Sequence, residues 1–340
     1  MTAALLADLR VLDLSIWRPG PYATSLLVAL GADVLKVEPP GGDPMRQYPK
    51  LFESVNAGKR SIVLDLKDGD HRARAMELAL EADAVVEGFR PGVMARLGLD
   101  AATVRAAKPA LVYCSISGYG QDDPRADLPG HDVNYQAWAG ALAPEGGAAT
   151  MPRLPLADLA GGMSAAFGIC AAVLGRQATG QGAYVDVSMT DVLATWTGRS
   201  GGRDADDVAE GPPQPVPGYG LFATADSGQV ALGVLSEQHF WADLCAELGL
   251  GELAGLGFEE RSARGSELQR HVAAAIEGRG RDELVAALTA VSVPVAPVLD
   301  RRGMLDSAPF PSFPIRLPRT EVAGPAPSLD EHRGQGFAAR

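Results

Sequence analysis

The segment Val11-Leu12-Asp13-Leu14-Ser15, followed by Pro19-Gly20-Pro21 and then by residues 22–30, decides the fold. The first stretch is apolar and β-branched, which predicts a strand, and the Pro-Gly-Pro stretch predicts a turn. Residues 22–30 have the apolar pattern of a helix, and Gly31 ends it. A strand, a turn and a helix in this order predict the opening half of a β-α-β unit.

The same alternation continues along the first part of the chain. We expect further strands at residues 34–38, 61–66, 84–87, 111–117 and 183–187, and helices at residues 71–82, 101–107, 160–177 and 190–196. Strands that alternate with helices predict a parallel sheet covered on both faces, which makes the fold class α/β. No Gly-x-Gly-x-x-Gly follows the first strand, so a dinucleotide site is not predicted. Glu38 is therefore interpreted as a solvated strand-end carboxylate rather than as a ribose ligand.

A second, smaller α+β domain is predicted at residues 218–308. Residues 219–224 and 229–234 flank Asp226-Ser227-Gly228, which predicts a hairpin. Helical patterns follow at residues 238–248, 268–276 and 281–288, and Pro294 and Pro297 confine a Val-rich strand at 291–298 to a sheet edge. Residues 201–217 are dense in Gly, Pro and Asp, which predicts a loop or linker after a large domain of residues 1–200. Residues 309–340 are Pro-rich and are expected to be extended.

The composition limits the partners and the compartment. The 340 residues carry a net charge of −12, which disfavours nucleic acid and anionic membrane surfaces as partners. Gly, Asp or Arg interrupts every apolar run before about 18 residues, so no membrane-spanning helix is expected. The N-terminus lacks a signal-peptide pattern, and Cys114, Cys170 and Cys245 stand apart in apolar runs, as buried thiols do in a reducing cytoplasm. No spacing suits a metal site.

Two short stretches carry the candidate chemistry: Gly130-His131-Asp132-Val133-Asn134-Tyr135 and Leu156-Ala157-Asp158-Leu159-Ala160-Gly161-Gly162-Met163. A histidine in such a turn is often a capping or packing residue, and an Asp at the start of a helix is often its N-cap. The functional alternative pairs His131 and Asp158 to move protons, or uses Asp158 alone as a nucleophile. Apolar Met163, Trp138 and Trp196 are assigned to the core.

Basic residues gather where strands are expected to end. Lys59 and Arg60 precede the third strand, Lys67 follows it, and Arg90 and Arg96 follow the fourth. In open α/β sheets the ligand crevice lies at the carboxyl ends of the strands, so these residues indicate a polyphosphate ligand, with dispersed surface charge as the alternative. Glu237 stands where a helix cap or a first-turn acid is expected.

The chain resembles the class III CoA-transferase family (the CaiB/BaiF superfamily), which also contains α-methylacyl-CoA racemase. Besides the two stretches above, the resemblance rests on residues 9–14, 31–41, 56–67, 87–92, 180–182 and 325–332. It implies a Rossmann-like large domain, a smaller domain, and a homodimer of interlinked chains in which the C-terminal segment returns to the large domain. No covalently bound cofactor is implied, because CoA enters as part of the substrate.

The resemblance also implies where CoA lies, with its thioester reaching Asp158. The family's basic residue after the second strand is Pro39 here, and Lys36 is the expected substitute. The CoA-binding residues implied are Lys36, Leu64, Asp65, Leu66, Lys67, Gly88, Phe89, Arg90, Arg96, Gly130, Asp132, Asn134 and Tyr135.

Two reactions remain open within this resemblance. In the racemases the residues matching His131 and Asp158 flank the α-carbon and exchange its proton, and the Gly-His-Asp-hydrophobe-Asn-Tyr form of the turn is racemase-like. In the transferases the residue matching Asp158 attacks the thioester, which forms an anhydride that CoA then opens. The glutamate that assists the racemase histidine matches Glu237 with one inserted residue, or Ser236 without it. A third hypothesis is a protein that binds CoA without turnover.

Overall fold

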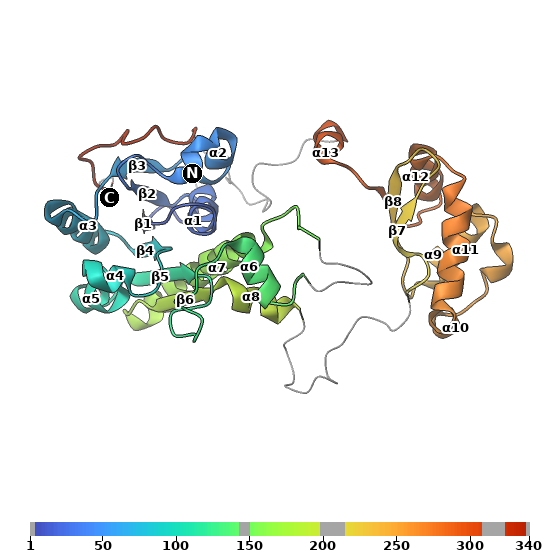
Figure 1. Ribbon diagram of the computed structural model, residues 1–340, viewed down its shortest axis with the longest axis horizontal. Helices are drawn as coiled ribbons and strands as arrows, with labels where there is room; N and C mark the ends of the chain where they lie inside the picture. The colour runs from blue at the N-terminus through green and yellow to red at the C-terminus, as the bar shows by residue number, and fades with distance from the viewer. Residues whose placement is uncertain (1–3, 143–149, 198–214, 308–323, 338–340) are drawn as a thin grey trace. The chain divides into compact units, whose positions relative to one another are not determined.

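The computed structural model describes residues 4–142, 150–197, 215–307 and 324–337. The chain divides into two units, one of Met1–Asp207 with Pro311–Arg340 and one of Val208–Phe310 (Figure 1). Most of the predicted linker 201–217, namely residues 201–214, lies outside the described residues, as do residues 309–323 of the predicted tail.

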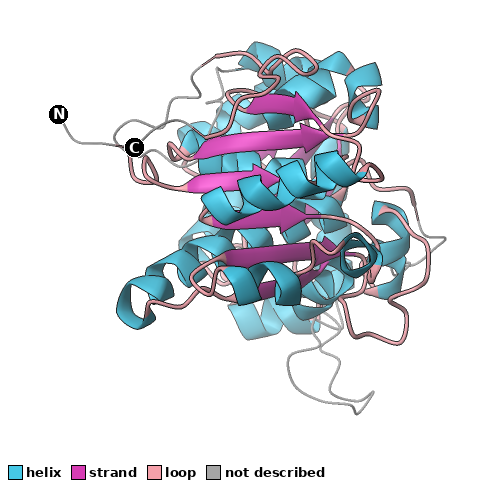
Figure 2. Cartoon of the chain, turned by 90° about the vertical axis from the view of Figure 1, so that its left-hand side faces the viewer, coloured by secondary structure: helices cyan, strands magenta, loops and turns pink. Residues whose placement is uncertain are grey.

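The large unit is built on a six-stranded parallel sheet with strand order β3-β2-β1-β4-β5-β6 (Figure 2). Its strands are β1 (Arg10–Asp13), β2 (Asp33–Glu38), β3 (Arg60–Val63), β4 (Ala84–Glu87), β5 (Val112–Ser117) and β6 (Tyr184–Ser188). The predicted α/β class is confirmed, and the strand boundaries differ from the predicted ones by a few residues. Because all six strands are parallel, the loops that follow them open at the same edge of the sheet.

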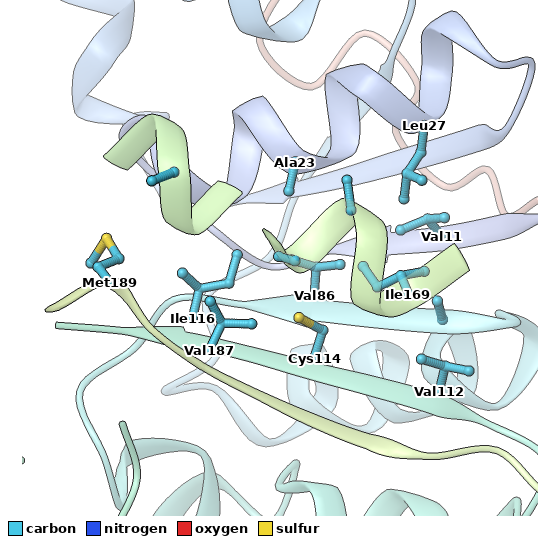
Figure 3. Close-up of a cluster of buried hydrophobic side chains, with 14 of the residues drawn as sticks. Val11, Ala23, Leu27, Val86, Val112, Cys114, Ile116, Ile169, Val187 and Met189 are labelled. Carbon is cyan, nitrogen blue, oxygen red and sulfur yellow. The ribbon is translucent and has the colours of Figure 1, made fainter. Parts of the chain in front are cut away.

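Helices cover both faces of this sheet. They are α1 (Pro19–Ala29), α2 (Pro49–Asn56), α3 (Gly69–Glu81), α4 (Val93–Leu97), α5 (Ala101–Ala107), α6 (Asp132–Trp138), α7 (Leu156–Thr179) and α8 (Met189–Trp196), with a 3-10 turn at Pro44–Gln47. Alternate strand residues point to opposite faces. Val11, Val86 and Cys114 pack against α1 and α7, where Ile169 lies close to them (Figure 3), whereas Leu12 and Tyr113 pack in the core that includes α3.

Helix α7 is the longest helix of the described residues and lies against α1, β5 and β6. By length and composition alone it is apolar enough to cross a membrane. Small residues let it approach its neighbours closely: a Cβ added to Gly162 would lie 2.6 Å from the carbonyl oxygen of Pro19, and one added to Gly161 would lie 2.6 Å from Cγ of Met189. These contacts fix the start of α7 against the first residues of α1 and α8.

We expect Gly162→Ala to lower the free energy of unfolding by about 1–3 kcal/mol, because the new methyl group has no room beside Pro19. Gly175 is the matched control, since it lies in the same helix with no atom within 4 Å of its virtual Cβ. Gly175→Ala should raise stability by about 0.5–1 kcal/mol. Urea unfolding of both variants measures the difference, and equal effects would contradict the close helix packing.

The C-terminal segment 324–337 runs beside β3. The Val63 amide donates to Oδ1 of Asp330 (2.8 Å), and the Ser61 carbonyl accepts from the His332 amide (2.9 Å). The Ser61 amide in turn donates to Nδ1 of His332 (3.2 Å). These bonds occupy backbone groups of β3 that an edge strand would otherwise expose.

The small unit packs helices on a three-stranded antiparallel sheet of order β7-β8-β9. Its elements are β7 (Tyr219–Ala223), β8 (Gln229–Gly233), α9 (Gln238–Glu247), a 3-10 turn (Gly251–Leu253), α10 (Phe258–Ala263), α11 (Gly265–Glu277), α12 (Arg281–Ala290), β9 (Val295–Pro297) and α13 (Arg301–Ser307). The hairpin around Ser227 forms as predicted, and β9, which holds Pro297, is an edge strand. The core surrounds fully buried Trp241.

One set of core assignments is wrong. The side chains of Trp138, Met163 and Trp196 are 57%, 53% and 62% exposed in the single chain. Helix α7 buries its Ala and Gly residues and leaves Met163 outward, whereas α6 and α8 bury Tyr135 and Leu193 and leave Trp138 and Trp196 outward.

Candidate active site

Asp158 is the third residue of α7, and the interpretation of it as the N-cap is wrong. The helix begins at Leu156 after Pro155, and the carboxylate that accepts its first N–H groups is that of Asp132. Oδ1 of Asp132 accepts from the amides of Ala157 (2.8 Å) and Asp158 (3.1 Å). Among the described residues the Asp158 carboxylate makes no hydrogen bond or ion pair of its own. Because Asp132 caps α7, helix capping does not explain why an acidic residue stands at position 158.

The surroundings of Asp158 change its acidity. Burial and the neighbouring carboxylate of Asp132 raise the pKa of Asp158 to about 7, and the charge of Arg18 offsets part of that increase. A carboxyl group with a pKa near 7 exists in both protonation states at neutral pH. That is the property a general acid or base requires.

His131 stands directly before α6 as its N-cap residue, and its side chain is exposed. Its amide donates to Oδ1 of Asn134 (3.0 Å). The next residue, Asp132, holds the start of α7 as described above, so one carboxylate joins the first turns of the two helices. The His131 turn and Asp158 are thereby brought together, although 26 residues separate Asp132 from Asp158.

The other residues of the turn support its shape. The Tyr135 hydroxyl donates to the carbonyl of Gly130 (2.6 Å), and its ring lies where side chains on Gly118 and Gly130 would clash. The ring also meets Tyr119 edge to face, with centroids 5.3 Å apart. Contacts with CoA were expected for Gly130, Asp132, Asn134 and Tyr135. In the structure each of these residues makes contacts that hold the His131 turn in place.

The other residues that were expected to contact CoA follow β3 and β4 at the carboxyl edge of the sheet. Leu64, Asp65, Leu66 and Lys67 continue from β3, and Gly88, Phe89 and Arg90 continue from β4. The side chains of Lys67, Arg90 and Arg96 are exposed there. Backbone amides shape both loops, because Asp65 accepts from the Lys67 amide (3.0 Å) and Glu87 from the Phe89 amide (2.7 Å).

Lys36 has a different place from the one expected. Its side chain has no exposed surface, and its Nζ lies 2.7 Å from the Ser15 carbonyl oxygen and 3.0 Å from Oδ2 of Asp43. A CoA phosphate would have to displace Asp43 to reach it, so we leave Lys36 out of the proposed CoA site. Glu38 is likewise not a solvated acid, because it is buried and paired with Arg46 through two hydrogen bonds (2.7 and 2.6 Å).

Glu237 belongs to the small unit, where it precedes α9 as its N-cap residue. Its carboxylate is exposed and accepts from the Leu235 amide (3.2 Å). Buried Arg261 donates to the carbonyls of Leu235 (2.9 Å) and Ser236 (3.4 Å), which fixes the turn that holds Glu237. Its assistance to His131 stays a prediction.

Arg18 is the residue that sequence reasoning missed. It lies in the β1–α1 loop, at the carboxyl edge of the sheet, and it is the cation whose charge lowers the pKa of Asp158. A cation placed between the first strand and Pro19-Gly20-Pro21 is the signal that could have identified it. Within the described ranges of the chain, no three His, Cys, Asp or Glu residues are arranged to hold a metal ion.

Comparisons with known proteins identify the family of this chain. A family model described as CoA-transferase family III matches residues 6–312. The acetyl-CoA:oxalate CoA-transferase of Acetobacter aceti is 34% identical over 86% of this chain and 80% of that protein. The α-methylacyl-CoA racemase of Homo sapiens is 34% identical over 72% of this chain and 65% of that protein. The crystal structure of Rv3272 from Mycobacterium tuberculosis has a TM-score of 0.83 at 29% identity and covers 98% of this chain and 99% of that one.

The parallel sheet with an unpartnered carboxyl group at the edge where the strands end is the architecture of an α/β enzyme. The chain belongs to CoA-transferase family III, whose members act on CoA and acyl-CoA substrates.

Proposed function

We propose that this enzyme catalyses 1,1-proton transfer at the α-carbon of a 2-methylacyl-CoA thioester, with His131 and Asp158 as the opposed acid and base. CoA would lie along the loops after β3 and β4, where exposed Lys67, Arg90 and Arg96 supply charges for its phosphates. The thioester end would then reach the start of α7.

The observation that carries this proposal is that the Asp158 carboxylate is unpartnered among the described residues and has a raised pKa. Asp132 takes over the capping of α7, and among the described residues the Asp158 carboxylate has no hydrogen-bond partner. Its pKa of about 7 matches the acid–base task at neutral pH. A carboxylate that served only to stabilise the helix would be hydrogen-bonded, and its pKa would be lowered rather than raised.

The proton balance of the reaction is simple. One group removes the α-proton, the electron pair of the C–H bond delocalises into the thioester carbonyl as an enolate, and the other group returns a proton to the opposite face. General acid–base assistance of this kind contributes on the order of 10²–10⁴ in rate. No other reactant is consumed, and the two groups have exchanged protonation states at the end of a turnover.

The experiment is an incubation of the enzyme with a 2-methylacyl-CoA in heavy water, with and without an added carboxylic acid. Deuterium at the α-carbon without the acid is the expected result. New thioester that forms only with the acid, together with an enzyme adduct trapped by hydroxylamine, would favour transfer instead. CoA binding with neither product would leave a CoA-binding protein and contradict both reactions.

The second candidate is CoA transfer between carboxylic acids, with Asp158 as the nucleophile that attacks the thioester and forms a mixed anhydride. Arg18 is the observation that favours it, because a cation beside Asp158 suits the approach of a second carboxylate. The oxalate transferase of Acetobacter aceti, which is similar over most of this chain, is named for a reaction of this kind.

We also propose that the chain forms the homodimer that the resemblance implies. Met163, Phe167 and Leu174 project from α7 with 53%, 76% and 67% of their side chains exposed. Apolar side chains in such numbers on one helix are typical of a subunit contact. Light scattering should give twice the mass of the 35.4 kDa chain, and a monomeric mass would contradict the dimer.

A further inference from the structure

The loop between β5 and α6 leads directly into the His131 turn, and Arg125 lies in the middle of it. The Arg125 guanidinium donates two hydrogen bonds to the carboxylate of Asp123, from Nε to Oδ1 (2.8 Å) and from Nη2 to Oδ2 (2.8 Å). The Arg125 amide donates to the same Oδ1 (2.7 Å). Two parallel bonds to one carboxylate fix the plane of a guanidinium, so the side chain has a defined orientation.

In this orientation the guanidinium lies over two aromatic rings. Its Cζ is 5.3 Å from the centroid of the Tyr119 ring and 5.2 Å from that of the Trp138 ring. Tyr119 follows β5, and Trp138 is the last residue of α6. Cation–π contacts at such partly exposed positions are worth about 0.5–1 kcal/mol each. Arg125 therefore joins the end of α6 to the segment that leaves the sheet.

The same rings hold the peptide that precedes His131. The Tyr119 ring meets the Tyr135 ring edge to face, with centroids 5.3 Å apart, and the Tyr135 hydroxyl donates to the Gly130 carbonyl (2.6 Å). A Cβ added to Gly130 would lie 2.7 Å from Cε1 of Tyr135 and 3.3 Å from the Tyr119 hydroxyl. Gly130 is thus packed against both tyrosines, one of which Arg125 contacts directly.

The position of the His131 imidazole depends on this backbone. The His131 side chain is exposed in the single chain, so packing around the ring does not fix it. The Arg125 carbonyl accepts from the Leu128 amide (2.8 Å), which forms a turn in the segment that enters the His131 turn. Arg125 therefore restrains His131 from both sides, through the loop before it and through α6 after it.

We propose that Arg125 is a positioning residue that holds the His131 imidazole on its own face of the substrate α-carbon. This inference rests on the proposed acid–base role of His131. A displacement of about 1 Å in a catalytic group can cost on the order of 10²-fold in rate. The effect should fall on His131 rather than on Asp158, because α7 is held separately where Gly162 packs against Pro19.

The test is the Arg125→Lys variant, which keeps the positive charge but loses the planar group that pairs with Asp123 and lies over the rings. Deuterium incorporation from heavy water is measured separately for the two enantiomers of a 2-methylacyl-CoA. The enantiomer whose exchange requires His131, identified with His131→Gln, should exchange about ten- to hundredfold more slowly. The other enantiomer should keep its rate, and the KM of both should be unchanged.

Two further variants make the test specific. Trp138→Leu removes one of the two rings and should slow the same enantiomer. The combined variant should be no slower than the slower single variant, because both changes break one contact. Arg264→Lys is the matched control, because Arg264 makes the same kind of two-bond ion pair with Glu267 (3.1 and 2.7 Å) in the small unit. It should change neither rate.

A second readout does not depend on turnover. In protein with ¹³C-labelled histidine, the His131 imidazole is assigned by the resonance that His131→Gln removes. That resonance should be single and narrow in the wild type and broadened or split in Arg125→Lys. Urea midpoints identify a variant that fails to fold. Trp138→Leu, which removes an exposed ring, then stands in for Arg125→Lys.

The proposal is overturned if a folded Arg125→Lys variant slows both enantiomers equally, or if it leaves both rates and the imidazole resonance as in the wild type. Absence of deuterium incorporation by the wild type would instead contradict the proposed function. The imidazole resonance then decides the positioning role alone, and a resonance that Arg125→Lys leaves unchanged overturns it.

Discussion

The Asp158→Asn variant is expected to lose acyl-CoA turnover while its fold becomes more stable. An amide neither removes the α-proton nor attacks a thioester, so both candidate reactions should fall by at least the roughly 10²–10⁴ that acid–base assistance contributes. The gain in stability should be about 1–4 kcal/mol, because each unit by which folding raises the pKa of Asp158 corresponds to about 1.4 kcal/mol. Asp243→Asn, at an exposed position on α9, is the matched control and should change neither quantity.

The stability gain has a defined pH dependence. The pKa of Asp158 is about 7 in the folded chain and 3.8 without the fold. Between these values the folded state holds a proton that the unfolded state has released, so wild-type stability from this group falls as the pH rises through the window. The variant should therefore match the wild type below pH 3.8 and exceed it most above about pH 7. A variant that is less stable at neutral pH would show that Asp158 serves the fold.

His131→Gln is the second change with a large expected effect. Loss of the imidazole should lower racemisation by about 10²–10⁴, because one face of the α-carbon then has no acid or base. Asp158 should still exchange the proton on its own face, so one enantiomer should incorporate deuterium with retention. Mass spectrometry and chiral analysis of each enantiomer in heavy water give the two rates, and exposed His271→Gln is the matched control.

The His131 variant also separates the two candidate reactions. CoA transfer through Asp158 needs no imidazole in the turn, so a transferase should lose only a small factor in rate. The two-base mechanism is wrong if His131→Gln slows the exchange of both enantiomers equally through a raised KM for acyl-CoA, with kcat unchanged. His131 would then bind the substrate.

The parallel sheet was predictable because apolar strand patterns alternate with helical patterns along the first part of the chain. Residues 84–87 were predicted with the boundaries that β4 has, since an apolar run buried on both faces is a strong local signal. Helix α6 was missed because Gly130, His131 and Asp132 have the composition of a turn, and the helix behind them is short. Local pattern alone could not extend a helix into that segment.

The site depends on contacts between distant parts of the chain, which the sequence does not encode locally. The capping of α7 by Asp132 joins residues 26 positions apart, so Asp158 was interpreted as the cap. Lys36 stands within the apolar run of β2, a position equally consistent with a ligand contact and with its buried ion pair to Asp43. The outward-facing Met163 and Trp196 were assigned to the core because a large apolar residue in a helical segment has the same identity whichever face of the helix it occupies.

Both candidate reactions require that the carboxyl group of Asp158 meet the reactive end of an acyl-CoA. The structure of the chain with bound 2-methylacyl-CoA measures this directly. We expect the α-carbon within about 3–3.5 Å of an Asp158 oxygen, with the His131 imidazole on the opposite face of that carbon. A pantetheine arm that ends away from the first turn of α7 would contradict the account.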